Sequence, residues 1–300
     1  MRVISLYTHG MTMGTSPGKN DHQRAKRSEV TGWSSSATRR NIAFLRSVDE
    51  TDLSGRGIAL TLTIKNCPET PDAWHSLRNA FIKRLKRLGL IRFHWVTEWQ
   101  RRGVPHLHGA FWFPDTVTKS EIMRHWLQVA QPYTATSGAQ HACAIDNAIG
   151  WFKYLSKHAA RGVSHYQRSS DNIPDKWKSK TGRMWGHGGD WTVREPSQIR
   201  LNDDGYYRLR RIIRNWRVAD ARQFPAVTSF LHKNPECRLL PDTLLRRLSG
   251  ASRRLSQSRR MLKSHRRTVS DVRGISEWID ESVVLSALGY LSETGSIVSS

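Results

Sequence analysis

The sequence predicts an α+β protein: an antiparallel sheet with flanking helices, followed by a basic, mainly helical C-terminal region. Period-two alternation over residues 58–64 indicates a strand with one face in the core, and residues 71–88 have the apolar spacing of an amphipathic helix. Two further strands follow, separated only by Arg101-Arg102-Gly103. A loop this short joins antiparallel strands, so a β-hairpin is expected at the centre of the fold.

Each predicted element begins or ends at a recognisable signal. The first helix begins with Pro71 and stops before Gly89, as helices commonly do. Thr118 and Glu121 have the spacing of a capping box and mark the start of the next helix. The elements expected on such grounds are a short strand within residues 139–144 and helices over residues 71–88, 115–131, 146–161 and 202–222.

Domain organisation follows from changes in composition along the chain. Residues 1–50 are polar and rich in Ser, Gly and basic residues, which is typical of a flexible basic arm. Within the arm, residues 32–45 could cap and start a short helix, or could form a loop packed over the domain. Residues 51–200 contain the predicted α+β domain. Residues 201–291 are expected to form a basic helical accessory region. The heptad-like apolar spacing over 238–273 suits DNA binding, oligomerisation, or a packed terminal helix with a solvated basic side. Residues 292–300 are expected to be a disordered tail.

Charge is the most informative property of the composition. The 300 residues include 48 Lys and Arg against 25 Asp and Glu, a formal net charge of +23. Such a balance is typical of proteins that bind polyanions, and nucleic acid is the expected partner. No stretch of about 20 apolar residues is present, which argues against a membrane span. Three widely spaced cysteines offer no disulfide framework, so a cytoplasmic protein is expected.

The predicted hairpin gathers three side chains that commonly bind metal ions. Side chains two apart on a strand share a face, so His106 and His108 point the same way. If Gln100 pairs with Val104 across the turn, Glu98 lies directly opposite His106. Two imidazoles and a carboxylate suit a divalent cation and leave positions open for substrate. The alternative is a structural histidine pair without a metal.

The helix over residues 146–161 carries a candidate nucleophile, Tyr154. Lys157 and His158 lie three and four residues further on and share its exposed flank. A phenol ionises near pH 10, so attack on phosphorus needs nearby positive charge, which Lys153 and Lys157 would supply. The alternative is a half-buried tyrosine that packs against the domain.

These motifs together resemble the HUH endonucleases, in particular the rolling-circle replication initiators of single-stranded DNA phages and plasmids. Three blocks match in the family's order: the strand Ala59-Leu-Thr-Leu-Thr63, the unit His106-Leu107-His108, and the pattern Tyr154-Leu-Ser-Lys157. Residues 32–45 and the segment Gly182-Arg-Met-Trp185-Gly186 also resemble replication proteins of filamentous phages. The resemblance covers roughly residues 30 to 200.

The resemblance implies an enzyme that nicks and rejoins single-stranded DNA. Positions matching His106, His108 and Glu98 would hold Mg²⁺ or Mn²⁺ to polarise the scissile phosphate, and Tyr154 would attack it. Lys157 would steady charge or position the metal and nucleophile. The expected product is a 5′-phosphotyrosine link with a free 3′-hydroxyl that primes synthesis. Implied partners are a replication-origin hairpin, a host helicase and a single-strand binding protein.

Further nucleic-acid contacts are expected where aromatic and basic residues alternate. The candidates are Arg39, Arg40, Lys153, Lys178 and Trp185. Tryptophans at 177, 185 and 191 among Lys and Arg could stack bases, or could instead close the edge of the sheet. Two other functions share parts of the pattern: a one-tyrosine transposase or plasmid relaxase, and a basic nucleic-acid-binding protein without catalytic activity.

Overall fold

The computed structural model describes residues 2–15, 29–160, 167–222, 275–279 and 281–298. The chain divides into two compact units. One comprises Met1–Leu6, Gly10–Asn20 and Ser197–Ser300, and the other comprises Tyr7–His9 and Asp21–Pro196. Both units combine antiparallel strands with helices, which confirms the predicted α+β class. Among the described residues, none of the helices has the length and apolar character needed to cross a bilayer.

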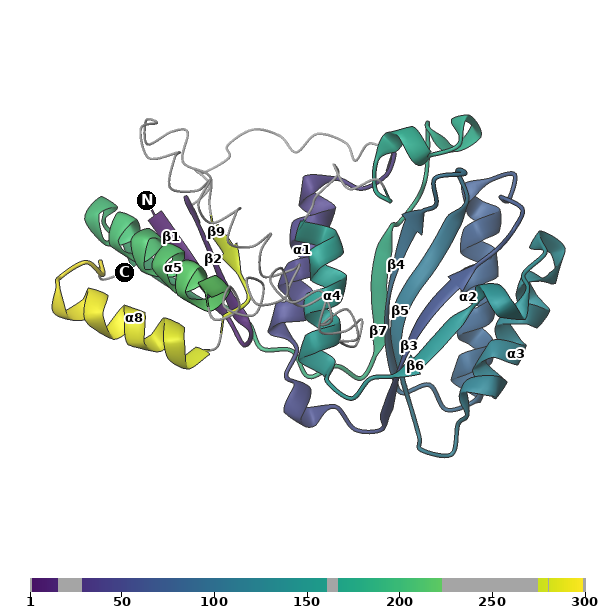
Figure 1. Ribbon diagram of the computed structural model, residues 1–300, viewed down its shortest axis with the longest axis horizontal. Helices are drawn as coiled ribbons and strands as arrows, with labels where there is room; N and C mark the ends of the chain where they lie inside the picture. Colours follow the sequence, from purple (N-terminus) through teal and green to yellow (C-terminus); the bar gives the residue numbers. More distant parts are fainter. Residues whose placement is uncertain (1, 16–28, 161–166, 223–274, 280, 299–300) are drawn as a thin grey trace, which may run out of the picture. The chain divides into compact units, whose positions relative to one another are not determined.

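The larger unit is built on a five-stranded antiparallel sheet with the order β6-β3-β5-β4-β7 (Figure 1). The strands are β3 (Arg56–Thr63), β4 (Arg92–Trp99), β5 (Pro105–Phe113), β6 (His141–Ala144) and β7 (Trp185–Gly189). The predicted strands at 58–64 and 139–144 correspond to β3 and β6. The predicted hairpin corresponds to β4 and β5, which lie at the centre of the sheet and are buried along their whole length.

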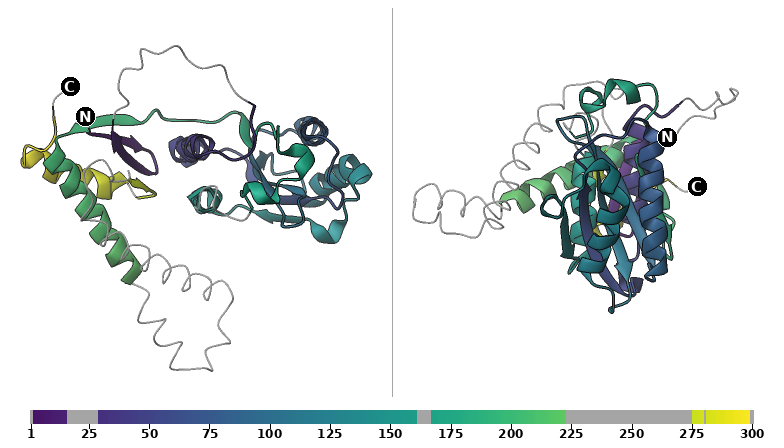
Figure 2. Two further views of the ribbon diagram at one scale, coloured as in Figure 1. Left: turned by 90° about the horizontal axis from the view of Figure 1, so that it is seen from above. Right: turned by 90° about the vertical axis from the view of Figure 1, so that its right-hand side faces the viewer.

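Helices cover both faces of this sheet (Figure 1, Figure 2). Helices α2 (Pro71–Arg87) and α3 (Lys119–Ala130) lie on one face, and α1 (Ser35–Ser47) and α4 (Ala148–Ala160) lie on the other. Short 3-10 helices occupy the connections: η1 (Glu50–Asp52), η2 (Gln131–Tyr133), η3 (Ser137–Ala139), η5 (Ser170–Asn172) and η6 (Asp175–Trp177).

Aromatic side chains form the core under α2 and α3. Phe81 of α2 packs edge-on against Trp126 of α3 at 5.3 Å and against Phe111 of β5 at 6.3 Å between ring centroids. Trp74 of α2 also meets Trp126 edge-on, and all four side chains are buried. Edge-to-face rings stabilise a core beyond the area that they bury. This face of the sheet is therefore anchored by packing, which holds the central hairpin in place.

The turn between β4 and β5 has the predicted geometry. The Gln100 backbone N–H donates to the Val104 carbonyl at 2.9 Å, and Gly103 adopts a φ of 73°. Glu98 lies directly opposite His106 in the ladder. The three-residue loop therefore sets the register of the hairpin. Because a slip by one residue would move every side chain to the other face, this turn decides which residues meet beside His106.

The helix starts also follow the sequence signals. Thr118 caps α3, with its hydroxyl accepting from the Glu121 backbone and the Glu121 carboxylate accepting from the Thr118 backbone. Thr70 caps α2, Pro71 occupies its first turn, and Gly89 follows its end with a φ of 85°. Local signals therefore determined where these helices begin and end.

The smaller unit has a four-stranded sheet of order β8-β1-β2-β9 and two helices among its described residues. The elements are β1 (Arg2–Tyr7), β2 (Gly10–Thr15), β8 (Ser197–Leu201), β9 (Ile275–Glu277), α5 (Asp203–Arg222) and α8 (Glu281–Glu293). Ile4, Met11, Leu209, Ile213 and Leu288 belong to its hydrophobic core. Helix α5 agrees with the predicted helix at 202–222. The heptad-like stretch at 238–273 lies outside the described residues.

Both ends of the chain differ from the expectation. Residues 2–15 form β1 and β2 rather than a flexible arm, whereas α1 corresponds to the short helix expected within residues 32–45. At the C-terminal end, Ser296 is buried and Ile297 forms a bridge with Leu201, so the described part of the expected tail is ordered. The reason is the same in both cases. Both β1 and Ile297 pair with β8, which is distant from both of them in the sequence. Such long-range pairing produces no local pattern in the sequence that could predict it.

Gly103→Ala tests whether the turn holds the hairpin. A residue with a Cβ is strained at positive φ, so this substitution should lower the free energy of unfolding by about 1 kcal/mol. The measurement is urea denaturation. Gly138→Ala is the control, because a Cβ there meets nothing within 4 Å and φ is not positive. Equal stability of the two variants would contradict the role given to the turn.

Candidate functional site

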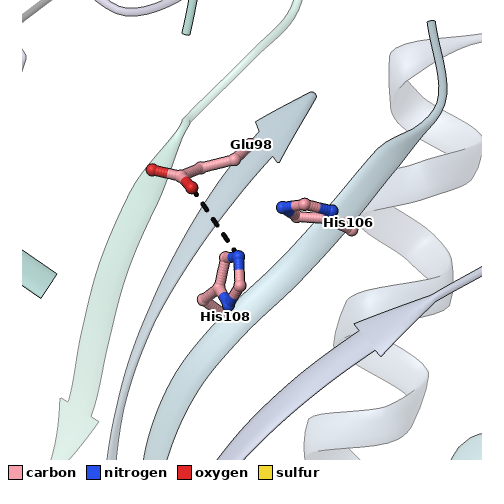
Figure 3. A group of neighbouring side chains, drawn as sticks. All are labelled: Glu98, His106 and His108. Carbon is pink, nitrogen blue, oxygen red and sulfur yellow. Dashed lines mark ion pairs between the residues drawn. The ribbon is translucent and has the colours of Figure 1, made fainter. Parts of the chain in front are cut away.

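Glu98, His106 and His108 converge on one face of the central hairpin (Figure 3). Glu98 comes from β4 and the two histidines come from β5. One potential ligand atom from each residue lies within 4.8 Å of the others, and all three side chains are buried. The alternation along β5 and the pairing of Glu98 with His106 produce this convergence. The cluster that the sequence predicted is therefore formed by the strands themselves.

The chemistry of this cluster suits a divalent cation. Nε2 of His108 faces Oε2 of Glu98 at 3.7 Å, which is longer than a hydrogen bond (Figure 3). The His106 and His108 rings lie edge to face with centroids 4.5 Å apart. Two nitrogen ligands and one carboxylate oxygen at such separations need only small side-chain movements to share an ion. The residues therefore fit the metal that the sequence predicted.

Thr61 orients His108. Its hydroxyl lies 2.9 Å from Nδ1 of His108, on the neighbouring strand β3. If Nδ1 donates its proton to this hydroxyl, Nε2 presents its lone pair toward Glu98. Metal-binding histidines commonly donate their second ring N–H in this way, which fixes the ring and its tautomer. Burial lowers the pKa of His108, and the charge of Arg168 acts in the same direction against that of Glu98, so the neutral ligand form is favoured.

Arg168 is a member of the site that the sequence did not reveal. Its Nε and Nη2 both lie 2.7 Å from Oε1 of Glu98, and both side chains are fully buried. The guanidinium also stacks on the indole of Trp33 at 3.9 Å, and Trp33 donates to the Thr97 carbonyl at 2.8 Å. Arg168 thus holds one oxygen of Glu98 and leaves the other turned toward His108. Its position in a loop, 70 residues after Glu98, has no sequence signal.

The segment that carries Arg168 is fastened to the sheet. The Trp99 backbone N–H, at the end of β4, donates to the Gln167 carbonyl at 2.7 Å, which continues the hydrogen bonding of this strand past its ladder with β7. The Gln167 amide nitrogen lies 3.4 Å from Nε2 of His106. This residue pair, Gln167 and Arg168, therefore contacts both His106 and Glu98. The segment covers the ligand cluster and fixes the carboxylate.

Helix α4 crosses the face of the sheet that carries the histidines. Trp112 shares this face with His106 and His108 because it follows them at even spacing on β5, and it packs against Phe152 of α4 at 6.2 Å. Tyr154 lies on the outer side of α4, with 39% of its surface exposed, and stacks on Trp151 at 5.0 Å. Lys157 belongs to the same helix, but its side chain lies outside the described residues.

The expected nucleic-acid contacts fall into two groups. Arg39 and Arg40 on α1 and Lys153 on α4 are exposed, and these two helices pack together on the same face of the sheet. Lys178 is exposed in a loop, 2.5 Å from Asp175. Trp185, in contrast, is half-buried on β7 and packs near Phe44 and His187.

The other two tryptophans of this region pack against other parts of the domain. Trp177 is fully buried and donates to the Pro68 carbonyl at 3.1 Å. Trp191 packs against Trp112 at 5.2 Å and against Phe44 at 5.5 Å. Both side chains therefore pack within the domain, Trp177 fully buried and Trp191 half-buried.

Comparison with known proteins identifies one family. Residues 57–159 match the family described as replication-associated protein ORF2. The chain is 46% identical over 301 residues to a replication-associated protein of Pseudomonas phage Pf3, covering 98% of this chain and 99% of that protein. The matched residues include β3, the central hairpin and α4, which together carry the ligand cluster and Tyr154.

Two bacterial proteins show similar identity over most of their length. Both are from Xylella fastidiosa and carry the provisional name of replication protein. The protein of strain Temecula1 is 50% identical over 230 residues, covering 74% of this chain and 88% of its own length. The protein of strain 9a5c is 51% identical over 229 residues, covering 74% and 81%. No solved structure matches the chain.

Arg168→Leu should lower the free energy of unfolding, because it leaves the Glu98 carboxylate buried without its arginine partner. Removing one partner of a buried ion pair commonly costs about 3 to 5 kcal/mol, because the remaining charge is left without compensation. Denaturant unfolding without added metal measures the loss. Adding Glu98→Gln to Arg168→Leu should restore much of it, since the buried charge is then gone. Arg39→Leu, at an exposed position on α1, is the control and should change stability by less than about 0.5 kcal/mol.

Proposed function

The chain belongs to this family of replication-associated proteins, and from this premise we propose that it initiates replication as an HUH endonuclease that nicks and rejoins single-stranded DNA. The observation that carries the proposal is the convergence of Glu98, His106 and His108 on the face crossed by α4, which bears Tyr154. A metal-ligand cluster and a phenol on one face are the two groups that such a reaction needs.

The ligand cluster would hold the cation through Oε2 of Glu98 and ring nitrogens of His106 and His108. Mg²⁺ or Mn²⁺ are the ions proposed, since a carboxylate with imidazoles accepts hard and borderline cations. A bound divalent cation would polarise the scissile phosphate and offset the charge that develops on its oxygens. Arg168 keeps Oε1 of Glu98 occupied, so the carboxylate would offer a single oxygen in a fixed direction.

Tyr154 would supply the nucleophile. Its Oη would form a bond to phosphorus as the bond between phosphorus and the 3′-oxygen breaks. The phenolic proton ends, in the overall balance, on the 3′-oxygen, which leaves as a hydroxyl. Lys153 is exposed one residue away and would favour the phenolate by its charge, as would Lys157 one turn further along the helix.

The covalent product conserves the energy of the phosphodiester bond. The 3′-hydroxyl would prime synthesis, and the reverse attack of a 3′-hydroxyl on the phosphotyrosine would rejoin the strand and release Tyr154. Transposases and relaxases with one tyrosine share this chemistry. The relatives of this chain are named for replication, which supports the initiator among these alternatives. A DNA origin hairpin is the proposed substrate, with a host helicase and single-strand binding protein as proposed partners.

Tyr154→Phe should abolish covalent attachment to DNA while leaving DNA binding within about twofold, because only the nucleophilic oxygen is removed. Purified protein is incubated with labelled single-stranded origin DNA and Mn²⁺, and adducts are separated under denaturing conditions. Tyr290→Phe is the matched control, since Tyr290 is also exposed but lies on α8 of the other unit. Adducts at the wild-type yield in Tyr154→Phe would remove this residue from the proposed mechanism.

Replacing both histidines tests the ligand cluster. The variant carrying His106→Ala and His108→Ala should lose Mn²⁺ binding in a calorimetric titration, together with metal-stimulated nicking, because two of the three ligands are gone. His141→Ala is the control, since His141 is exposed at the edge of the same sheet and lies on β6. Unchanged Mn²⁺ affinity in the double variant would show that the metal binds elsewhere.

A further inference from the structure

Arg78 is a buried cation on the face of the sheet opposite to the ligand cluster. It lies on α2, is only 6% exposed, and its guanidinium stacks on the indole of Trp95 at 3.7 Å. Nη2 donates to Oδ1 of Asn79 at 3.3 Å. The other two nitrogens, Nε and Nη1, make no hydrogen bond within the described part of the chain. Stacking on Trp95 covers the flat face of the guanidinium, but the N–H groups at its edge still lack hydrogen-bond acceptors.

The charges around Arg78 are positive rather than negative. Burial lowers the pKa of Arg78 to about 10, and the charge of Arg183 acts in the same direction. At neutral pH the guanidinium therefore stays protonated. Asp72, the acidic residue in the first turn of α2, lies 3.7 Å from Lys180 instead. Buried charges in proteins are usually paired, so a buried arginine that has no carboxylate partner among the described residues is unusual.

Arg183 is the charged neighbour of Arg78 that lies at the surface. Arg183 is exposed and lies in the loop that precedes β7, the edge strand of the sheet. A long exposed side chain can move aside or reach over a ligand without changing the backbone. Trp95 lies on β4, where alternation turns it away from Glu98. The arginine pair is therefore separate from the proposed metal cluster.

We propose that Arg78 and Arg183 form a binding site for a phosphate group of a nucleic-acid backbone, with Trp95 as its floor. A phosphate between the two guanidinium groups would accept hydrogen bonds from the unsatisfied N–H groups of Arg78. Its negative charge would also offset the repulsion between the two arginines. The planar fork of arginine matches phosphate oxygens in a bidentate manner. The formal net charge of +23 makes a polyanion the fitting source of that phosphate. Single-stranded DNA as the nucleic acid rests on the proposed function.

The site would act in holding DNA rather than in cutting it. A strand bound here would contact the loop before β7, while α4, which carries the proposed nucleophile, lies on the opposite face of the sheet from α2 (Figure 1). Phosphate contacts fix position on the strand and carry no base specificity. Loss of the site should therefore weaken binding to all sequences alike.

The first test measures DNA binding in a Tyr154→Phe background, so that no strand cleavage takes place. Arg183→Gln should weaken binding of a single-stranded oligonucleotide on the order of tenfold, since a charge-assisted contact is lost. The slope of log affinity against log salt should fall by about 0.7, the value for one phosphate contact on a single strand. Arg87→Gln is the control, because Arg87 is exposed on the same helix as Arg78. Equal losses in affinity and slope for both variants would overturn the site.

The second test uses inorganic phosphate alone and needs no DNA or nicking. At constant ionic strength, phosphate should raise the melting temperature of the parent protein more than that of Arg78→Met or Arg183→Gln, because ligands that bind the folded state stabilise it. An equal rise in all three proteins would overturn the proposal. Arg183→Gln decides the result even if Arg78→Met fails to fold. A positive phosphate result together with absent nicking would leave this site standing while the proposed function fails.

The two arginines should also be coupled. Because both would contact one phosphate, the variant carrying Arg78→Met and Arg183→Gln should bind the oligonucleotide only slightly more weakly than either single variant. If the fold losses in affinity of the two single variants multiply in the double variant, the two arginines make independent contacts. That result would contradict a shared phosphate.

Discussion

The buried carboxylate of Glu98 is the constraint on which the rest of the larger unit depends. A carboxylate fully removed from water needs charged or hydrogen-bonding partners, and here Arg168 and His108 surround it. Arg168 is held beside it because its segment is hydrogen-bonded to Trp99 at the end of β4 and its guanidinium stacks on Trp33. The hairpin register, the covering segment and the residues just before α1 are thus fixed around one side chain.

The two faces of the central sheet differ in what covers them and in the side chains that they carry. The face under α2 and α3 is closed by interlocking aromatic rings such as Phe81 and Trp126, which give a rigid support. The face under α1 and α4 carries the histidines and places an exposed tyrosine on the helix that buries Phe152. Rigid strands therefore hold the ligand residues, while a surface helix presents Tyr154. This separation would suit the proposed reaction, in which a DNA strand has to reach both groups.

Positive charge extends this arrangement beyond the ligand cluster. Exposed basic residues on α1 and α4, among them Arg39 and Lys153, share the face of the proposed chemistry. Arg78 and Arg183 lie at the other face, where the packing against Trp95 keeps a guanidinium in place. Basic residues on both faces of the sheet would give a strand several phosphate contacts, and such contacts would hold DNA of any sequence.

The sequence by itself determined the α+β class, the central hairpin and the convergence of Glu98 with the two histidines. It did so because strand alternation and a short turn with Gly103 act over a few residues. Only the tertiary structure decided that Arg168 completes the carboxylate's surroundings, that Trp177 is buried, and that both chain ends pair with β8. Those contacts join residues far apart in the chain, and burial depends on what packs against a side chain, so no local pattern encodes them.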